Sequence, residues 1–198
     1  MAKTTEIEFK NLLTKKEFNL LLRTFNVSSH HFFTQVNHYF DTKDFKFKKM
    51  NSALRIRELP NSFEMTLKRA GHRGSLEINQ QLEKSEVDAI LINPYIPDGE
   101  IKNAIHELGL KDIELGYFGS LTTHRAEVEY KNGQLVFDHS LYLDQEDYEV
   151  EYEAANWNEG STIFRQFLEI YKIEVKMTDT KIGRMYKAKM KKQKDEEM

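Results

Sequence analysis

The chain has 198 residues, of which 39% are hydrophobic, and this length can bury one sizeable core. Charged residues make up 31% of the chain, but the formal net charge is only −3, so overall charge predicts no strong affinity for double-stranded nucleic acid or membranes. The sequence contains no cysteine, which excludes disulfides, thiolate metal sites and a cysteine nucleophile.

No apolar run opens the N-terminus, and no stretch approaches the length of a membrane span. We therefore expect a soluble cytoplasmic protein without a membrane partner. Nothing in the composition requires a second domain, so we expect a single domain over residues 1–190, followed by a charged tail over 191–198.

The segment 5–10 (TEIEFK) alternates polar and apolar side chains, which predicts a β-strand. In a strand, Glu6, Glu8 and Lys10 share one face, and the apolar side chains between them share the other. A sheet face turned to water explains such a strand when it is considered alone, so the other strands must decide its role.

The remaining elements follow from changes in the spacing of apolar residues along the chain. Helices are predicted at residues 13–25, 84–92, 98–108 and 159–171, and from near 179. Strands are predicted at residues 35–41, 53–59, 62–68, 75–82, 120–130, 135–138 and 148–153. Short turns link most strands, so we expect about eight strands in a largely antiparallel sheet and about five helices.

Nearly every predicted strand has one ionic and one apolar face. The ionic faces carry Glu6, Glu8 and Lys10; Arg55 and Arg57; Glu64 and Lys68; Arg125, Glu127 and Glu129; and Glu149, Glu151 and Glu153. An open sheet would turn these faces to water, whereas a closed barrel would turn them inward, where ions need partners or a charged ligand. The paired arginines and blocks of acids favour the second arrangement, an α+β fold in which an eight-stranded antiparallel barrel carries helices on its outside.

Acids gather on the first and last predicted strands, and bases gather on the middle ones. This distribution suits a polyanion bridged by metal ions, because Mg²⁺ and Mn²⁺ prefer carboxylate oxygens, while Arg and Lys bind phosphate oxygens. The pattern therefore predicts a site for a linear triphosphate. The sequence has no G-x-x-x-x-G-K-[ST] segment, which excludes a P-loop.

A set of segments in order along nearly the whole chain resembles the CYTH superfamily, also called the triphosphate tunnel metalloenzymes. They are E-x-E-x-K (6–10), NHYFDT (37–42), LRIRE (54–58), TLKR (66–69), LEINQQL (76–82), LTTHR (121–125), VFD (136–138), EVEYE (149–153) and TKIGR (180–184). The first segment alone is weak evidence, but the ordered set is specific. It looks most like the small bacterial stand-alone proteins of the YjbK type.

The resemblance implies a barrel that binds triphosphate inside, and it assigns roles to residues by position. The implied metal ligands are Glu6, Glu8, Asp138, Glu149 and Glu151, with Glu153 as another possible member of the last acidic pair. The implied phosphate-binding residues are Lys10, Arg55, Arg57, Lys68, Arg125, Lys181 and Arg184. The implied catalytic residues are Glu6, Glu8, Lys10 and Lys181.

We therefore expect a phosphohydrolase that depends on Mg²⁺ or Mn²⁺ and cleaves inorganic triphosphate or a small triphosphate-containing compound. One alternative is a class IV-type adenylyl cyclase, which converts ATP to cyclic AMP and pyrophosphate. Another is a non-catalytic module that binds polyphosphate or nucleotides. The expected partner is a triphosphate-containing small molecule, and the expected assembly is a monomer or homodimer. The natural substrate and the preferred metal stay open.

Overall fold

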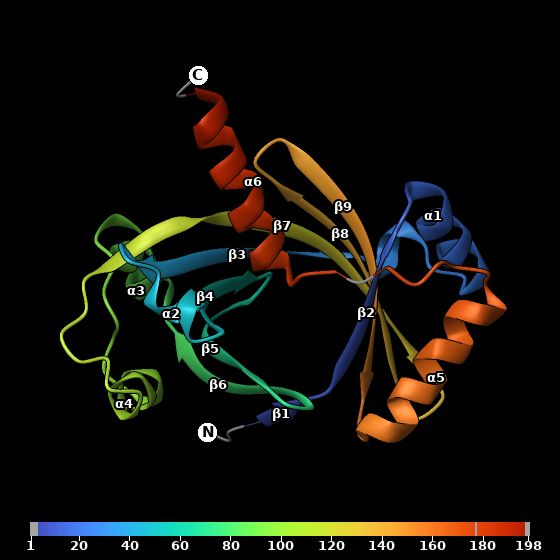
Figure 1. The fold of residues 1–198 in the computed structure, drawn as a ribbon, viewed down its shortest axis with the longest axis horizontal. Coiled ribbons are helices and arrows are strands. Elements are labelled where there is room, and N and C mark those ends of the chain that lie inside the picture. The colour runs from blue at the N-terminus through green and yellow to red at the C-terminus, as the bar shows by residue number, and fades with distance from the viewer. Residues whose placement is uncertain (1–3, 177, 197–198) are drawn as a thin grey trace. The chain divides into compact units, whose positions relative to one another are not determined.

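The computed structural model describes residues 4–176 and 178–196. The chain forms two compact units (Figure 1). Unit 1 comprises Met1–Glu6 and Gln35–Ser120, and unit 2 comprises Ile7–Thr34 and Leu121–Met198. Two long strands, β3 (Phe33–Thr42) and β7 (Leu115–Tyr130), contribute residues to both units.

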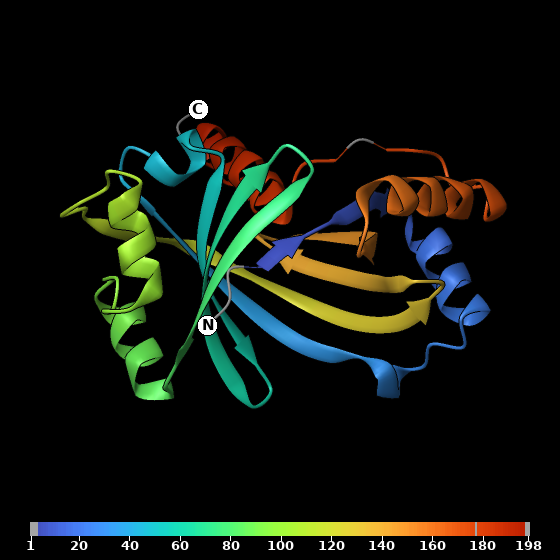
Figure 2. The same cartoon turned by 90° about the horizontal axis from the view of Figure 1, so that it is seen from below.

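Unit 1 is built on strands in the order β1-β6-β5-β4-β3-β7. Its other elements are β1 (Thr4–Glu6), α2 (Lys46–Lys49), β4 (Ser52–Leu59), β5 (Ser62–Gly71), β6 (Gly74–Leu82), α3 (Lys84–Ile92) and α4 (Glu100–Glu107). The apolar strand face carries Leu54, Leu67 and Ile78, which join side chains of α3 and α4 in one buried core. Figure 2 shows these two helices beside the strands of the unit. The opposite strand face carries the charged side chains, and we call it the polar face of unit 1.

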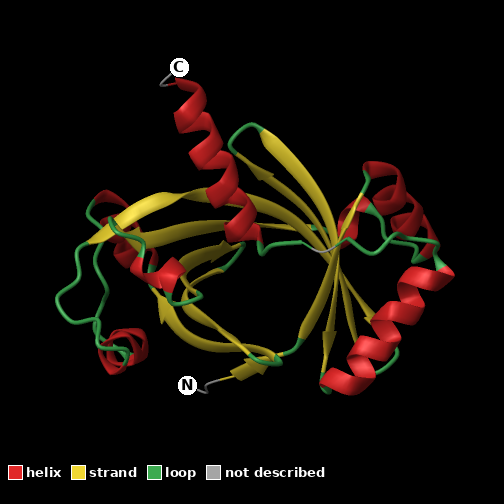
Figure 3. Ribbon diagram, in the orientation of Figure 1, coloured by secondary structure: helices red, strands yellow, loops and turns green. Residues whose placement is uncertain are grey.

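Unit 2 is built on strands in the order β7-β8-β9-β2. Its other elements are β2 (Glu8–Leu13), α1 (Lys15–Thr24), a 3₁₀ turn (Ser29–His31), β8 (Gly133–Tyr142), β9 (Gln145–Ala154), α5 (Trp157–Ile170) and α6 (Lys181–Glu196). Helices α1 and α5 lie beside β8 and β9 (Figure 3). Phe18 of α1 and Phe167 of α5 belong to the buried core on the apolar face of these strands. The opposite face of these strands carries charged side chains, and we call it the polar face of unit 2. The first turn of α6 contacts this face, where the ammonium of Lys181 donates a hydrogen bond to Glu149.

The structure confirms an α+β fold with antiparallel strand pairs and helices on the apolar strand faces. Residues 4–176 and 178–196 contain nine strands rather than the predicted eight, because the strand predicted at 5–10 is divided at Ile7. The segment before Ile7 pairs with β6, whereas the segment after it pairs with β9, so the hydrogen-bond ladder changes partner there.

Other differences concern the ends of elements. Strand β7 begins at Leu115, five residues before the predicted start at 120. The helix predicted at 98–108 runs over Glu100–Glu107 with Gly99 as its N-cap, and Asp98 before it forms an ion pair with Lys102. Helix α6 runs through Glu196 and so covers most of the tail predicted at 191–198, of which residues 197 and 198 lie outside the described residues.

The described helices include none that is both long and apolar enough to cross a membrane.

Candidate functional site

Three buried carboxylates gather on the polar face of unit 2. Asp138 on β8 lies directly opposite Glu149 on β9, and Glu151 follows two residues later on the same face. Their exposed fractions are 0%, 1% and 3%, and each offers an oxygen within 4.8 Å of the others'. Carboxylates buried so closely need cations beside them, so we call these three residues the acidic cluster.

Lys181, the first residue of α6, supplies one such cation. Its Nζ lies 2.8 Å from Asp138, 2.7 Å from Glu149 and 2.6 Å from Glu151. Arg125 on β7 supplies a second, because its guanidinium donates to both oxygens of Asp138, at 2.9 and 2.6 Å, and to Glu151 at 3.0 Å. Two-point contacts of this kind fix the orientation of both side chains.

Burial and neighbouring charges shift the pKa values of Lys181, Glu151 and Glu149. Burial opposes the charged form of Lys181, but the three carboxylates hold its pKa well above the usual value. Burial also works against ionised Glu151, yet Lys181, Lys10 and Arg125 keep the pKa of that carboxyl well below its usual range. For Glu149, burial is the larger influence and raises the pKa, although Lys181 opposes it. The two neighbouring glutamates therefore have pKa values shifted in opposite directions.

Lys10 and Arg184 extend the cluster. Lys10 on β2 donates to Glu8 at 2.5 Å and lies 3.6 Å from Glu151. Arg184, one turn beyond the start of α6, donates to Asp147 at 2.8 Å and lies 2.7 Å from Glu149. The side chains brought together in unit 2 thus include most of the residues predicted for the site, namely Glu8, Lys10, Arg125, Asp138, Glu149, Glu151, Lys181 and Arg184.

Glu153, the alternative member of the acidic pair, is peripheral by comparison. Its carboxylate lies 3.9 Å from Arg125, and its side chain is 31% exposed, against 1% for Glu149. The geometry of unit 2 therefore favours Glu149 and Glu151 as the acidic pair.

A second charged group lies on the polar face of unit 1, and we call it the basic cluster. Lys68 on β5 donates to Glu6 on β1 and lies 3.1 Å from Glu77 on β6. Arg55 on β4 lies 3.9 Å from the same Glu77. Arg57, two residues after Arg55, donates to Asn37 on β3 at 3.2 Å. The four predicted residues of unit 1, Glu6, Arg55, Arg57 and Lys68, all lie on these adjacent strands.

The predicted separation of acids from bases is incomplete in both units. Glu77 is an acid among the bases of the middle strands, and Arg125 is a base among the acids of the later strands. Glu77 is not among the predicted site residues, because its contact with Lys68 depends on the register of β5 against β6. Asp147 was missed for a similar reason, since its partner Arg184 is 37 residues away in the chain.

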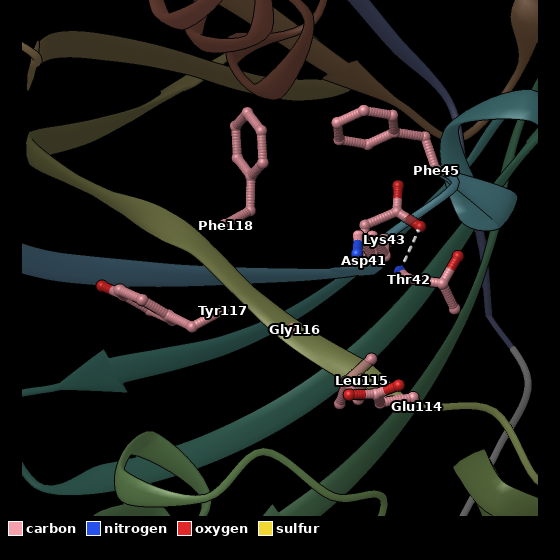
Figure 4. A pocket seen from close by; sticks show the side chains of 9 residues that line it. All are labelled: Asp41, Thr42, Lys43, Phe45, Glu114, Leu115, Gly116, Tyr117 and Phe118. Atoms are coloured by element: carbon pink, nitrogen blue, oxygen red, sulfur yellow. Dashed lines mark hydrogen bonds between the residues drawn. The ribbon is translucent and has the colours of Figure 1, made fainter.

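Unit 1 also contains a cavity of about 260 Å³ between the end of β3 and the start of β7. Figure 4 shows the rings of Phe45 and Phe118, whose centroids are 6.3 Å apart, above the carboxylate of Asp41. That carboxylate accepts hydrogen bonds from the amides of Thr42, Phe47 and Lys48. Asp41 is therefore engaged in holding α2, and this cavity contributes no ionic group of either cluster.

The acidic cluster meets the requirements of a hard divalent cation. Its ligand atoms are carboxylate oxygens, they lie close enough together to share one ion, and they are buried. They already hold one positive charge in common, the ammonium of Lys181. The residues present therefore fit a bound metal ion.

The antiparallel strands of each unit carry a charged cluster on one face and an apolar core on the other, which defines a class of β-rich domain with ionic strand faces. Comparison with known proteins gives the family. The model of the CYTH domain matches residues 4–186, and the chain belongs to this family.

Relatives of known name match over nearly the full length. The chain is 44% identical over 191 residues to the candidate triphosphatase YjbK of Bacillus subtilis (strain 168), covering 96% of this chain and 99% of the relative. A crystal structure of a candidate adenylate cyclase from Bacillus halodurans is 40% identical, with a TM-score of 0.90 over 94% of this chain and all of the other, 100%. At 40% identity this match confirms the predicted class of fold, antiparallel strands with helices on their apolar faces, and the part of the chain that the structure describes has nine strands in place of eight.

The fold also occurs in a more distant protein. HpAC1 from Hippeastrum, a candidate adenylyl cyclase described as having a dominant triphosphatase activity, is 22% identical. Its structure has a TM-score of 0.78, covering 92% of this chain and 95% of the other. At this identity the match shows the fold alone.

Proposed function

We propose that the protein is a metal-dependent phosphohydrolase that cleaves inorganic triphosphate or a small triphosphate-containing compound. The observation that carries this proposal is the acidic cluster: Asp138, Glu149 and Glu151 are buried within 4.8 Å of one another and are in contact with bases. The family membership and the 44% identity to a relative named as a candidate triphosphatase support the same conclusion.

The metal would be Mg²⁺ or Mn²⁺, held by Asp138, Glu149 and Glu151, with Glu6 and Glu8 as further proposed ligands. When bound, such an ion polarises phosphoryl oxygens and lowers the pKa of bound water. Glu6 contacts Lys68 in unit 1, and Glu8 contacts Lys10 in unit 2, so each proposed ligand also neighbours a proposed phosphate-binding base.

The bases of the chain would bind and orient the phosphates. Arg55, Arg57 and Lys68 in unit 1, and Lys10, Arg125, Lys181 and Arg184 in unit 2, offer charge-assisted hydrogen bonds to phosphate oxygens. Hydrolysis breaks one phosphoanhydride bond as the oxygen of water bonds to phosphorus, and the products are diphosphate and phosphate. Fixed positive charge beside the leaving diphosphate would stabilise the negative charge that develops on it.

The test is phosphate release from tripolyphosphate, ATP and thiamine triphosphate, with Mg²⁺ or Mn²⁺ and with EDTA. We expect phosphate release that requires the metal ion. Glu151→Gln keeps the size of the side chain but removes a charged ligand, so we expect its rate to fall by at least about 100-fold. Metal-independent release, or an unchanged rate in this variant, would contradict the proposal.

An adenylyl cyclase is the second candidate, because the 40% identical relative from Bacillus halodurans is named as a candidate adenylate cyclase. The same assay with ATP separates the two reactions, since cyclisation yields cyclic AMP and pyrophosphate, whereas hydrolysis yields free phosphate. Binding of tripolyphosphate without any product from the three compounds would instead favour a binding module.

A further inference from the structure

Glu77 is a buried acid within the basic cluster of unit 1, and the proposed function gives it no role. Its residue is 8% exposed, and its carboxylate lies 3.1 Å from Lys68 and 3.9 Å from Arg55. Both of these bases are proposed to bind phosphate. A carboxylate of the chain therefore lies where phosphate oxygens are expected to bind.

The register of the strands explains this position. Glu77 lies directly opposite Lys68 across β5 and β6, on the polar face. Arg55 lies in the next row, opposite Thr66, which in turn lies opposite Asn79. Neighbouring strands are about 4.8 Å apart, so side chains of two adjacent rows on three strands can surround a group as small as one phosphate.

The row next to Glu77, formed by Arg55, Thr66 and Asn79, contains polar atoms without hydrogen-bond partners in the part of the chain that the structure describes. Among the described residues, Arg55 Nε, Thr66 Oγ1 and Asn79 Oδ1 are buried atoms that have no hydrogen-bond partner. Buried polar atoms without partners are rare in folded proteins and are typical of places where a ligand binds. Arg55 Nε and Thr66 Oγ1 can donate, which suits an anion with several oxygens, whereas Asn79 Oδ1 only accepts and adds nothing to an anion site.

The charge of Glu77 is well supported. Burial favours its neutral form, but Arg55, Lys68 and Arg57 together hold the pKa of the carboxyl below its usual value. A carboxylate and a phosphoryl group that share the same two bases repel each other and compete for the same donors. Binding of the phosphoryl group must therefore overcome the contacts that Glu77 makes in the free protein.

We propose that Glu77 is an internal anion that lowers the affinity of the basic cluster for phosphoryl groups and so eases release of the product. This inference rests on the proposed function, because it takes triphosphate as the ligand. Glu77 is a residue that sets affinity through Arg55 and Lys68, and it has no part in the acidic cluster.

The experiment is calorimetric titration of the full chain with tripolyphosphate and with pyrophosphate in EDTA, which measures binding without turnover. We expect Glu77→Gln to bind both anions about tenfold more tightly than the wild type, because a competing negative charge is removed. Glu77→Asp keeps the charge and should bind within about twofold of the wild type.

The matched control is Asp88→Asn. Asp88 is exposed on α3 and pairs with Lys84 at 3.0 Å, so its removal tests a general loss of negative charge in unit 1. We expect its affinities to stay within about twofold of the wild type. If Glu77→Gln does not fold, Glu77→Ala, which removes the charge without adding an amide, serves in its place and has the same expected result.

Two kinds of outcome overturn the inference. Equal or weaker binding by the Glu77 variants, with normal binding by the wild type, shows that Glu77 does not compete, and it leaves the proposed function intact. No binding of tripolyphosphate by the wild type, with or without Mg²⁺, overturns the proposed function and this inference together.

Discussion

Lys181 supplies a positive charge that all three carboxylates of the acidic cluster contact. Its ammonium is hydrogen-bonded to Glu149 and Glu151, and it also lies 2.8 Å from Asp138. An uncompensated buried carboxylate is far more costly than a paired one, so the acidic cluster depends on this side chain when no metal is present.

We therefore predict that Lys181→Met lowers the free energy of unfolding by roughly 3–5 kcal/mol at neutral pH in EDTA, as measured by urea denaturation. Mn²⁺ should restore more stability to this variant than it gives to the wild type, because in the variant the ion replaces the missing cation.

Lys187→Met is the matched control on the same helix. Lys187 is exposed and pairs with Asp179 at the surface, so the change should stay within about 0.5 kcal/mol of the wild type. Equal losses in the two variants, or a Lys181→Met protein that gains nothing from Mn²⁺, would contradict the role given to Lys181.

Tyr142 provides a second test at the level of single residues. Burial and the hydrogen bond to Asp147 raise its pKa to about 12. The folded pKa lies above that of tyrosine in an unfolded chain, so this stabilising contribution is complete below pH of about 10 and is lost as the pH rises through about 12.

We predict that the wild type loses more stability than Tyr142→Phe when urea unfolding is repeated at intervals between pH 9 and pH 12. The variant lacks the hydroxyl and so lacks this proton linkage. Tyr95→Phe, which alters an exposed ring, should follow the wild type. Parallel pH profiles for the wild type and Tyr142→Phe would rule out the linkage.

At the level of elements, the sequence predicts the features that depend on residues close together in the chain, such as helix ends and strand faces. Thr14 and Glu17 form a capping box at the start of α1, and Gly109, with a positive φ of 78°, follows the end of α4. Alternation placed Arg125, Glu149 and Glu151 on polar strand faces, because side chains alternate with period two wherever a strand forms.

Local sequence patterns do not predict which elements contact one another. The division at Ile7 follows from a change of partner strand, which no pattern within 5–10 records. The contact of Glu77 with Lys68 depends on the register of β5 and β6, and Lys181 meets the acidic cluster across about 30 residues of chain. For the candidate site, the sequence therefore predicted the faces and the charged residue types but not the ion pairs.

At the scale of the whole molecule, the chain has two separate buried cores. One lies under α3 and α4 in unit 1, and the other lies under α1 and α5 in unit 2. Strands β3 and β7 cross from one unit into the other, at residues 34–35 and 120–121. Unfolding one unit alone would require both strands to be disrupted in their interiors, so we infer that the two units unfold together.

This inference predicts that a cavity in unit 1 destabilises unit 2. Ile105 on α4 is fully buried in the core of unit 1, and Ile105→Ala should cost about 2–5 kcal/mol. The chain has 1 tryptophan, Trp157, which lies on α5 in unit 2. Its fluorescence during urea unfolding therefore reports on unit 2 alone, and its midpoint should shift to lower urea in Ile105→Ala.

Ile92→Ala is the control, because Ile92 is 85% exposed on unit 1 and its truncation opens no cavity. If the units unfold together, circular dichroism and Trp157 fluorescence give one coincident transition in every variant, and only Ile105→Ala moves it. If they unfold independently, the Trp157 midpoint stays at its wild-type value in Ile105→Ala, while circular dichroism shows an earlier second transition. Continuity of β3 and β7 would then be too weak to couple the two cores.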